Sequence, residues 1–249
     1  METAKVSDDS AMVEQLRESP YPHVIWNTIV APSKAFASLS NKPRWLFPYI
    51  LSILVVFTTL VLTNGVKMDD IKADIQSNTA LNAQEIDRRI DNIEAQGTQG
   101  VSWANVRLAA FAVTAIQTIK LFAMVLIFWL AFHLVKAKIS FKRILAVCSF
   151  SFLVLVPEAI LKIPLIFSKG TTYIYLGPAV LLPVDWKYSP LFNLFDKLDI
   201  FSVWMVVLLV IGFSQVLEIS KKKAAITVGY IWGIWLLLSM FVGDLVQIR

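Results

Sequence analysis

Glu158 and Lys162 are two opposite charges inside a strongly apolar stretch, Leu153–Phe167, which reads LVLVPEAILKIPLIF. They lie four positions apart with the acid first, which is the favourable order for an ion pair on one face of a helix. Pro157 and Pro164 bracket them, and each proline removes a backbone hydrogen bond from a helix. Whether these charges form a solute route or a structural ion pair depends on the medium around the segment.

The composition indicates that this medium is a lipid bilayer. Hydrophobic residues make up 57% of the 249 residues and charged residues only 16%. Five apolar runs, the first of 18 residues and the others of about 20 or more, are long enough to cross roughly 30 Å of hydrocarbon as helices. The runs are Leu46–Thr63, Leu108–Val135, Ile144–Phe167, Ile200–Ile219 and Ala224–Leu245. The sequence therefore predicts an all-α membrane protein with five transmembrane helices, and the shorter run Tyr173–Val184 is expected to be interfacial or partly re-entrant.

The basic residues predict the orientation. Lys136–Arg143 (KAKISFKR) and Lys221–Lys223 (KKK, expected to connect the last two spans) carry positive charges without acids, which is typical of cytoplasmic loops. Five spans then place the amino terminus in the cytoplasm and the carboxyl terminus outside. The net charge of +5 follows from this arrangement, so we expect no nucleic-acid partner.

The segment before the first run is divided in two. Residues 1–19 are expected to be a mobile cytoplasmic tail, and residues 20–45 an interfacial juxtamembrane segment with two short helices, the second opened by Pro32. Three aromatic residues are candidate interfacial side chains: Trp26, Phe36 and Trp45. Packing of this segment against the inner end of the helix bundle is the alternative.

The remaining residues, 46–249, form the predicted membrane domain, with an extracytoplasmic helical insertion at residues 67–103. Asn82 can cap a helix there, with Glu85 three residues on. Isoleucines then recur at helical spacing: Ile86, Ile90 and Ile93. Ile71 and Ile75, upstream, can form a partner helix, which would make the loop a helical hairpin.

The depth of the charges indicates a partner for Glu158. It lies about 21 Å along its helix, at 1.5 Å per residue, where an ionised side chain costs about 2.5–3.5 kcal/mol. Lys120, in the preceding run, is predicted at a similar depth, and a contact between Lys120 and Glu158 would neutralise both charges. Lys162 is closer to the end of its run, so its side chain can reach the lipid headgroups. The alternatives are a polar solute or proton route, and snorkelling of both lysines beside a protonated glutamate.

No pattern typical of an enzyme is present. His23 and His133 are far apart, the single cysteine has no partner, and there is no glycine-rich phosphate loop. Asp196 and Asp199 precede the fourth apolar run, where they are expected to cap a helix. We therefore predict no enzymatic activity, no cofactor and no metal.

Three stretches resemble bacterial members of the Yip1 family: WNTIVAPSKAFASLSNKPRWLFPYI, KISFKRILAVCSFSFLVLVPEAI and LFNLFDKLDIFSVWMVVLLVIGFSQVLEISKKKAAITVGYIWGIW. The family pattern includes W…P…F…L…P…P near the amino terminus, SFK before a span, and an aspartate-rich segment followed by F…W…G. The resemblance covers roughly Pro20 to Leu245 and implies a five-span fold. It does not imply the Rab GTPase binding of eukaryotic relatives, because LDIFSVW stands here where they carry a DLYGP-type signature.

The predicted function is therefore that of a non-enzymatic protein of the bacterial cytoplasmic membrane that binds or organises other membrane components. Expected partners are membrane lipid and either copies of itself or other integral membrane proteins. The alternatives are a small permease or channel-like transporter using Glu158 and Lys120, and an accessory subunit of a membrane export complex. Repeated broken spans and several polar midplane positions would favour transport, and the sequence shows one broken span.

Overall fold

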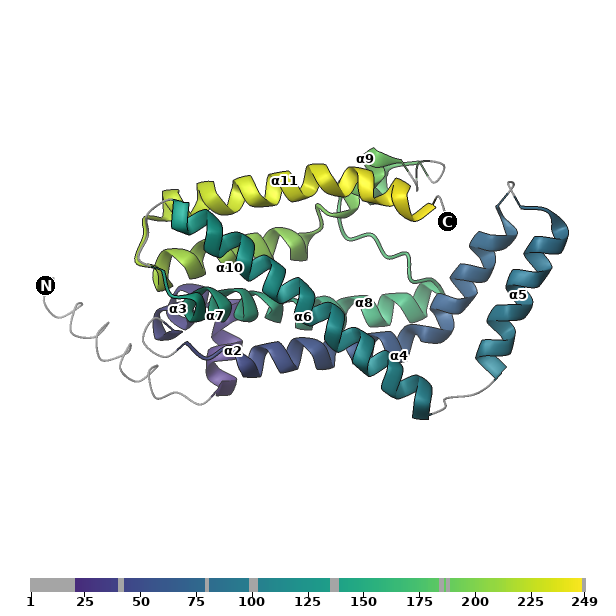
Figure 1. Cartoon of the computed structure of the whole chain (residues 1–249), viewed down its shortest axis with the longest axis horizontal. Coiled ribbons are helices and arrows are strands. Elements are labelled where there is room, and N and C mark those ends of the chain that lie inside the picture. The colour runs from purple at the N-terminus through teal and green to yellow at the C-terminus, as the bar shows by residue number, and fades with distance from the viewer. Residues whose placement is uncertain are drawn as a thin grey trace, which may run out of the picture. The chain divides into compact units, whose positions relative to one another are not determined.

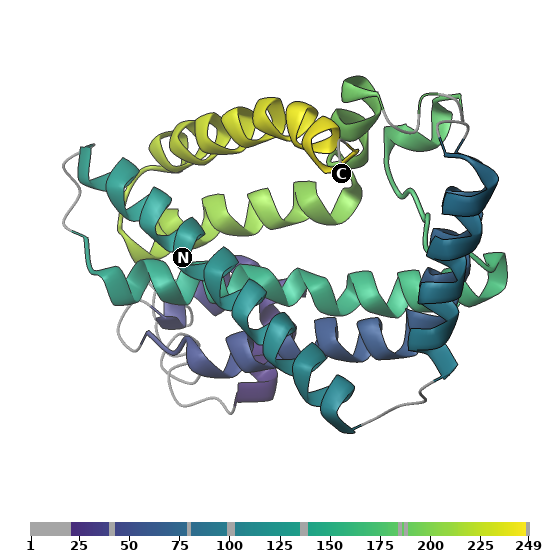
Figure 2. The ribbon, with the colours of Figure 1, turned by 45° about the vertical axis from the view of Figure 1, so that its right-hand side comes forward.

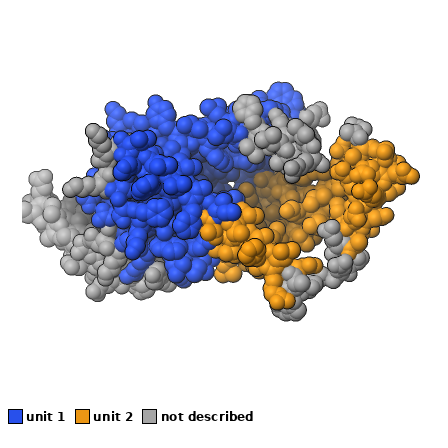
Figure 3. Space-filling model, in the orientation of Figure 1, with its two compact units in different colours: residues 1–52, 119–155, 175–249 blue, residues 53–118, 156–174 orange. Residues whose placement is uncertain are grey.

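The computed structural model describes residues 21–39, 43–78, 81–98, 103–134, 139–183, 186 and 189–247, and all regular elements in these ranges are helical. The predicted tail, residues 1–19, and the basic residues Lys136 and Lys138 lie outside them. The chain forms two compact units (Figure 3). Unit 1 contains residues 1–52, 119–155 and 175–249, and unit 2 contains residues 53–118 and 156–174.

Figure 1 labels the helices in chain order. They are α2 (Tyr21–Val30), α3 (Pro32–Leu39), α4 (Leu46–Gln76), α5 (Ala83–Thr98), α6 (Trp103–Leu134), α7 (Phe141–Ser151), the 3-10 turn η1 (Phe152–Val154), α8 (Leu155–Lys169), the 3-10 turn η2 (Pro178–Leu181), α9 (Pro190–Asp196), α10 (Ile200–Val216) and α11 (Lys221–Gln247). The two short amino-terminal helices, the second beginning at Pro32, are as predicted.

Four helical segments in the described ranges are long and apolar enough to cross a membrane: Leu46–Gln76, Asn105–Leu134, Phe141–Lys169 and Lys221–Met240. A fifth apolar helix, α10, is shorter, with 17 residues. The third of the long segments comprises α7, η1 and α8 in direct succession. The chain is thus a multi-pass membrane protein whose described residues form only helices as regular elements, with four long apolar helices and one shorter one.

α10 lies at the centre of unit 1, where it contacts α3, α7, η1 and α11. It runs beside α11 in both ribbon views (Figure 1, Figure 2). The ring of Phe213 on α10 packs against two rings of α6, with centroids 4.8 Å from those of both Phe128 and Phe132. Aromatic burial of this kind supplies much of the contact area in a helical core.

Gly212 on α10 allows two other helices to approach its backbone closely. A Cβ atom at this position would lie 2.6 Å from Cγ1 of Val147 on α7 and 3.0 Å from Cε1 of Phe36 on α3. These distances are shorter than a van der Waals contact, so only glycine fits without displacement of the neighbours. Gly212 is therefore explained by packing inside unit 1.

α7 and η1 form the most buried segment of unit 1. Every residue of 144–154 is buried, whereas the other long apolar helices leave many large apolar side chains exposed. Its hydroxyls are paired: Ser149 donates to the carbonyl of Trp45 over 2.6 Å, and Ser151 donates to the carbonyl of Val147 over 2.9 Å. A helix buried all round and satisfied in this way belongs to the interior of the bundle.

The connection between α10 and α11 differs from the prediction. Lys221–Lys223 forms the first turn of α11, and the connection is residues 217–220. Glu218 has a φ of 55°, so the chain leaves α10 through the left-handed region, and Oγ of Ser220 accepts a hydrogen bond from the N–H of Lys223 over 3.3 Å. Lysine is a good helix former, so a basic run next to a serine cap continues into a helix.

In unit 2, α4 continues past its apolar run at Thr63 to Gln76, so Ile71 and Ile75 belong to the same helix rather than to a separate one. Residues 64–98, which comprise this extension and α5, are called the hairpin below (Figure 1). The N–H of Glu85 donates to Oδ1 of Asn82 over 2.9 Å, which confirms the predicted cap. An ion pair of 2.9 Å between Lys72 and Glu94 joins the two helices of the hairpin.

Candidate functional site

Glu158 and Lys162 form an ion pair within α8. Nζ of Lys162 donates to Oε1 of Glu158 over 2.7 Å, and the two side chains are 28% and 22% exposed. Both residues lie on one face of the helix, a single turn apart. The two charges therefore neutralise each other inside an apolar helix, without a contribution from a second helix.

The structure places Lys120 on the exposed surface of α6. Its position in the chain assigns it to unit 1, whereas Glu158 belongs to unit 2. The Glu158–Lys120 couple stays a prediction. Because Glu158 already accepts a hydrogen bond from Lys162, its charge has a partner without Lys120.

The prolines that bracket this pair have different effects. Pro164 lies inside α8, where its missing N–H leaves one carbonyl of the preceding turn without its usual donor. Pro157 comes three residues after the 3-10 turn Phe152–Val154. In a regular α-helix a proline ring clashes with the carbonyl four residues earlier, here that of Leu153, and the chain has 3-10 geometry at that point.

The two aspartates before α10 have separate roles. Oδ1 of Asp199 accepts hydrogen bonds from the N–H groups of Phe201 and Ser202, both at 2.8 Å, so the predicted capping role of Asp199 is confirmed. Asp196 is instead the last residue of α9, and Oδ2 of its carboxylate accepts from Nζ of Lys197 over 2.6 Å. Asp196 belongs to α9, which ends before α10 begins, so of the two acids Asp199 alone caps α10.

The three candidate interfacial aromatics lie in different surroundings. Trp26 on α2 is 65% exposed, whereas Phe36 on α3 is completely buried in the core. Trp45 is half-buried, and the centroid of its ring lies 6.1 Å from that of Tyr49. Phe36 therefore contributes to packing of α3 against the bundle, which is the alternative stated for this segment, and Trp26 remains available to a membrane surface.

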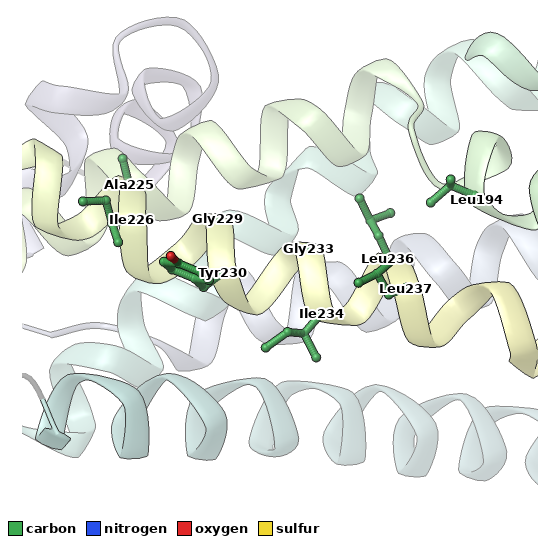
Figure 4. A pocket seen from close by; sticks show the side chains of 9 residues that line it. All are labelled: Leu194, Ala225, Ile226, Gly229, Tyr230, Gly233, Ile234, Leu236 and Leu237. Atoms are coloured by element: carbon green, nitrogen blue, oxygen red, sulfur yellow. The ribbon is translucent and has the colours of Figure 1, made fainter.

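A groove that was not predicted from the sequence runs along α11 in unit 1 (Figure 4). The groove has a volume of about 610 Å³ and is lined by α11 together with Leu194 of α9. Its small residues recur every four positions: Ala225, Gly229 and Gly233. The larger side chains beside them are exposed: Ile226 (48%), Tyr230 (71%) and Ile234 (57%). The G-x-x-x-G spacing in an apolar helix is the signal that could have indicated this groove.

Among the described residues, no group of three or more histidine, cysteine, aspartate or glutamate side chains could hold a metal ion. Glu158 is paired with Lys162 within α8, Asp199 caps α10, and Asp196 is paired with Lys197 at the end of α9. The arrangement supplies neither a nucleophile beside a base nor a set of metal ligands. The described site consists of exposed apolar helix surface and paired charges.

These features define a multi-pass helical membrane protein. The sequence model of the Yip1 domain family matches residues 26–243, and the chain therefore belongs to the Yip1 domain family, whose members are generally non-enzymatic membrane proteins. The family resemblance of the three stretches is confirmed. A relative, Membrane protein YknW of Bacillus subtilis (strain 168), is 22% identical over 222 residues, which cover 88% of this chain and 89% of the relative. No solved structure matches the chain significantly.

Proposed function

We propose that the protein is a five-span, non-enzymatic component of the bacterial cytoplasmic membrane that organises membrane proteins through helix–helix association, and that its α11 pairs with α11 of a second copy. The observation that carries this proposal is the open groove on α11. A Cβ atom added to Gly229 or to Gly233 would meet no atom within 4 Å.

The space around Gly229 and Gly233 differs from the space around Gly212. Gly212 is required because Val147 and Phe36 occupy the space that a side chain would fill. Gly229 and Gly233 have no such neighbour, although glycine in a helix interior is about 1 kcal/mol less favourable than alanine. In membrane helices, small residues four apart let a second helix approach closely enough for extensive van der Waals contact. The groove on α11 has the form that such contact needs.

A second copy is the occupant that the groove fits, because the same helix face carries both complementary parts. The floor is formed by small residues at positions 225, 229 and 233, and a ridge beside it by Ile226, Tyr230 and Ile234. A two-fold axis places the ridge of one α11 into the floor of the other, as an isologous interface requires. The lining is almost entirely apolar, as expected for a contact between helices inside a membrane.

We infer that α10 also crosses the membrane, which gives five spans in total, and that the amino terminus is cytoplasmic. The 17 residues of α10 extend about 25 Å at 1.5 Å per residue, near the lower limit for a crossing helix. Five crossings place the basic segments 136–143 and 221–223 on the same side, which the positive-inside rule assigns to the cytoplasm. The carboxyl terminus and the hairpin then lie outside.

Transport through Glu158 and Lys120 has less support than association. A carboxylate that serves a solute or proton needs access to it, whereas Oε1 of Glu158 already accepts a hydrogen bond from Lys162. A role as an accessory subunit of an export complex uses the same helix-pairing chemistry with a different partner. The experiment below therefore separates self-association from binding of another protein.

The test is the oligomeric state of the full-length protein in mild detergent and in lipid nanodiscs over a range of concentrations. The wild-type protein is expected to form a dimer, and Gly229→Leu with Gly233→Leu to shift it to a monomer. Gly65→Leu is the matched control, because Gly65 on α4 also has open space around its Cα. A monomeric wild type contradicts self-association. Co-purification of a different membrane protein that the double variant loses assigns the groove to that protein instead.

A further inference from the structure

The turn that follows α8 contacts α4 within unit 2, and this contact is independent of the α11 groove. Gly170 has a φ of 65° and ends α8 in the left-handed conformation that favours glycine. Its N–H donates to the carbonyl of Ile166 over 2.9 Å, as in a helix-terminating turn. The three residues after the glycine, Thr171, Thr172 and Tyr173, all donate hydrogen bonds to α4.

Asp70 receives most of these bonds. Oγ1 of Thr171 donates to Oδ1 of Asp70 over 2.8 Å, and the N–H of Thr172 donates to Oδ2 over 2.6 Å. The hydroxyl of Thr172 donates to the same Oδ2. Asp70 is only 9% exposed, and a carboxylate removed from water is stable only when donors replace its hydration. Both oxygens of Asp70 have such donors here.

Asp74 provides a second attachment one turn further along α4. The hydroxyl of Tyr173 donates to Oδ2 of Asp74. Positions i and i+4 lie on the same face of a helix, so three consecutive residues after α8 bind two acids on one face of α4. The segments joined in this way lie about a hundred positions apart in the sequence.

We propose that Asp70, Asp74, Thr171, Thr172 and Tyr173 form a clamp that fixes the C-terminal end of α8 to α4 and thereby holds the hairpin in a defined position relative to α8. α4 continues from Asp70 into the hairpin, and α8 carries the Glu158–Lys162 pair. The clamp therefore links a segment outside the apolar runs to the helix that holds the charged pair.

Three donors and a low exposed fraction distinguish this contact from an ordinary surface interaction. The Lys72–Glu94 ion pair inside the hairpin is solvent-exposed, with side chains 30% and 54% exposed. Exposed ion pairs contribute little, because water competes for both partners and salt screens them. Hydrogen bonds to a buried carboxylate are stronger, since their loss leaves the charge without solvation. The clamp is thus the firmer of these two attachments.

The test is backbone hydrogen exchange of the full-length protein in lipid nanodiscs. Asp70→Asn is expected to raise the exchange rate of the Thr172 amide about tenfold or more, the factor to which one hydrogen bond to a charged acceptor corresponds. Exchange across residues 64–78 is expected to rise with it, while α10 keeps its protection. Asp69→Asn is the matched control, because it removes the same charge from the adjacent, exposed position.

A milder variant covers the case in which Asp70→Asn disturbs the whole protein. Thr171→Val removes one donor with little change of shape. It is expected to raise the exchange rate several-fold both in the turn, residues 168–176, and in residues 64–78. The proposal is overturned if Thr171→Val leaves residues 168–176 unchanged or if Asp69→Asn and Asp70→Asn act alike. It is also overturned if exchange rises at Thr172 while residues 64–78 keep the wild-type rate, because the turn then does not hold the hairpin.

Discussion

Lys162 donates a hydrogen bond to Glu158 across one turn of α8, with 2.7 Å between Nζ and Oε1. Both residues lie in a segment whose other side chains are almost all apolar. A charged pair that is bonded within one helix can enter the membrane with that helix already neutralised. Each charge alone would be expensive there, so the two residues are expected to depend on each other.

The first prediction concerns this dependence. Glu158→Gln and Lys162→Met are each expected to destabilise the protein by about 1–3 kcal/mol, because each leaves the other charge without its partner. The double variant is expected to recover most of the loss. Thermal unfolding in detergent measures the coupling through a double-mutant cycle. Strict additivity of the two losses would show that the ion pair does not stabilise the protein.

A parallel cycle with Lys120→Met tests the Glu158–Lys120 couple that the sequence predicts. Because Lys162 is the partner in the structure, Lys120→Met combined with Glu158→Gln is expected to be additive within about 0.5 kcal/mol. A coupling energy between Lys120 and Glu158 as large as that between Lys162 and Glu158 would mean that both lysines share the carboxylate. The predicted pair between Lys120 and Glu158 would then be supported.

The second prediction concerns the glycines of unit 1. Gly212→Ala is expected to destabilise the protein by about 1–3 kcal/mol, because its Cβ atom would lie 2.6 Å from Val147. In a detergent that keeps the protein monomeric, Gly229→Ala meets open space and is expected to leave thermal stability unchanged or slightly raised. Both variants are compared by unfolding in the same detergent. Equal destabilisation by the two substitutions would be inconsistent with an open groove at Gly229.

The third prediction concerns the start of α10. Asp199→Ala is expected to destabilise the protein by about 1 kcal/mol, since two N–H groups lose their acceptor. Asp196→Ala serves as the control, because Asp196 only pairs with the adjacent Lys197, at a half-exposed position. Hydrogen exchange in the first turn of α10 reports the effect locally. An Asp196→Ala variant that raises exchange there as much as Asp199→Ala would remove the distinction between the two acids.

The sequence predicted the features that depend on local signals. Run length and hydropathy indicated the apolar helices, Pro32 indicated the start of α3, and Asn82 the cap of α5. α4 was predicted too short because the end of an apolar run at Thr63 is not the end of a helix, and helix-forming residues continue to Gln76. The sequence predicts a loop at Lys221–Lys223, whereas α11 begins there. A basic run indicates where a span reaches water, and a helix can begin on the water side of that point.

The features that the sequence did not predict depend on tertiary contacts. The G-x-x-x-G spacing of Gly229 and Gly233 is visible in the sequence, but only the structure shows that this face is open while Gly212 is filled. The bonds from Thr171 and Thr172 to Asp70 join residues about a hundred positions apart. No periodicity or cap signal relates such residues, and Asp70 alone looks like an ordinary surface acid.

The fourth prediction concerns orientation. In a Cys148→Ser background, a cysteine at Ala83 is expected to react with a membrane-impermeant thiol reagent in intact cells, and a cysteine at Lys223 to react only after the membrane is opened. The basis is that the basic segments 136–143 and 221–223, which contain no acid, fall on the same side of a chain with five spans. Labelling at position 223 but not at position 83 would reverse the orientation.

The central claim is that α11 pairs with α11 of a second copy, and disulfide cross-linking in native membranes tests it most directly. In the Cys148→Ser background, Tyr230→Cys on the exposed ridge is expected to give a covalent dimer on mild oxidation. Trp235→Cys, which is also exposed but lies about 140° around the helix at 100° per residue, is expected to give little. Equal cross-linking at both positions, or none at Tyr230→Cys, would contradict the pairing.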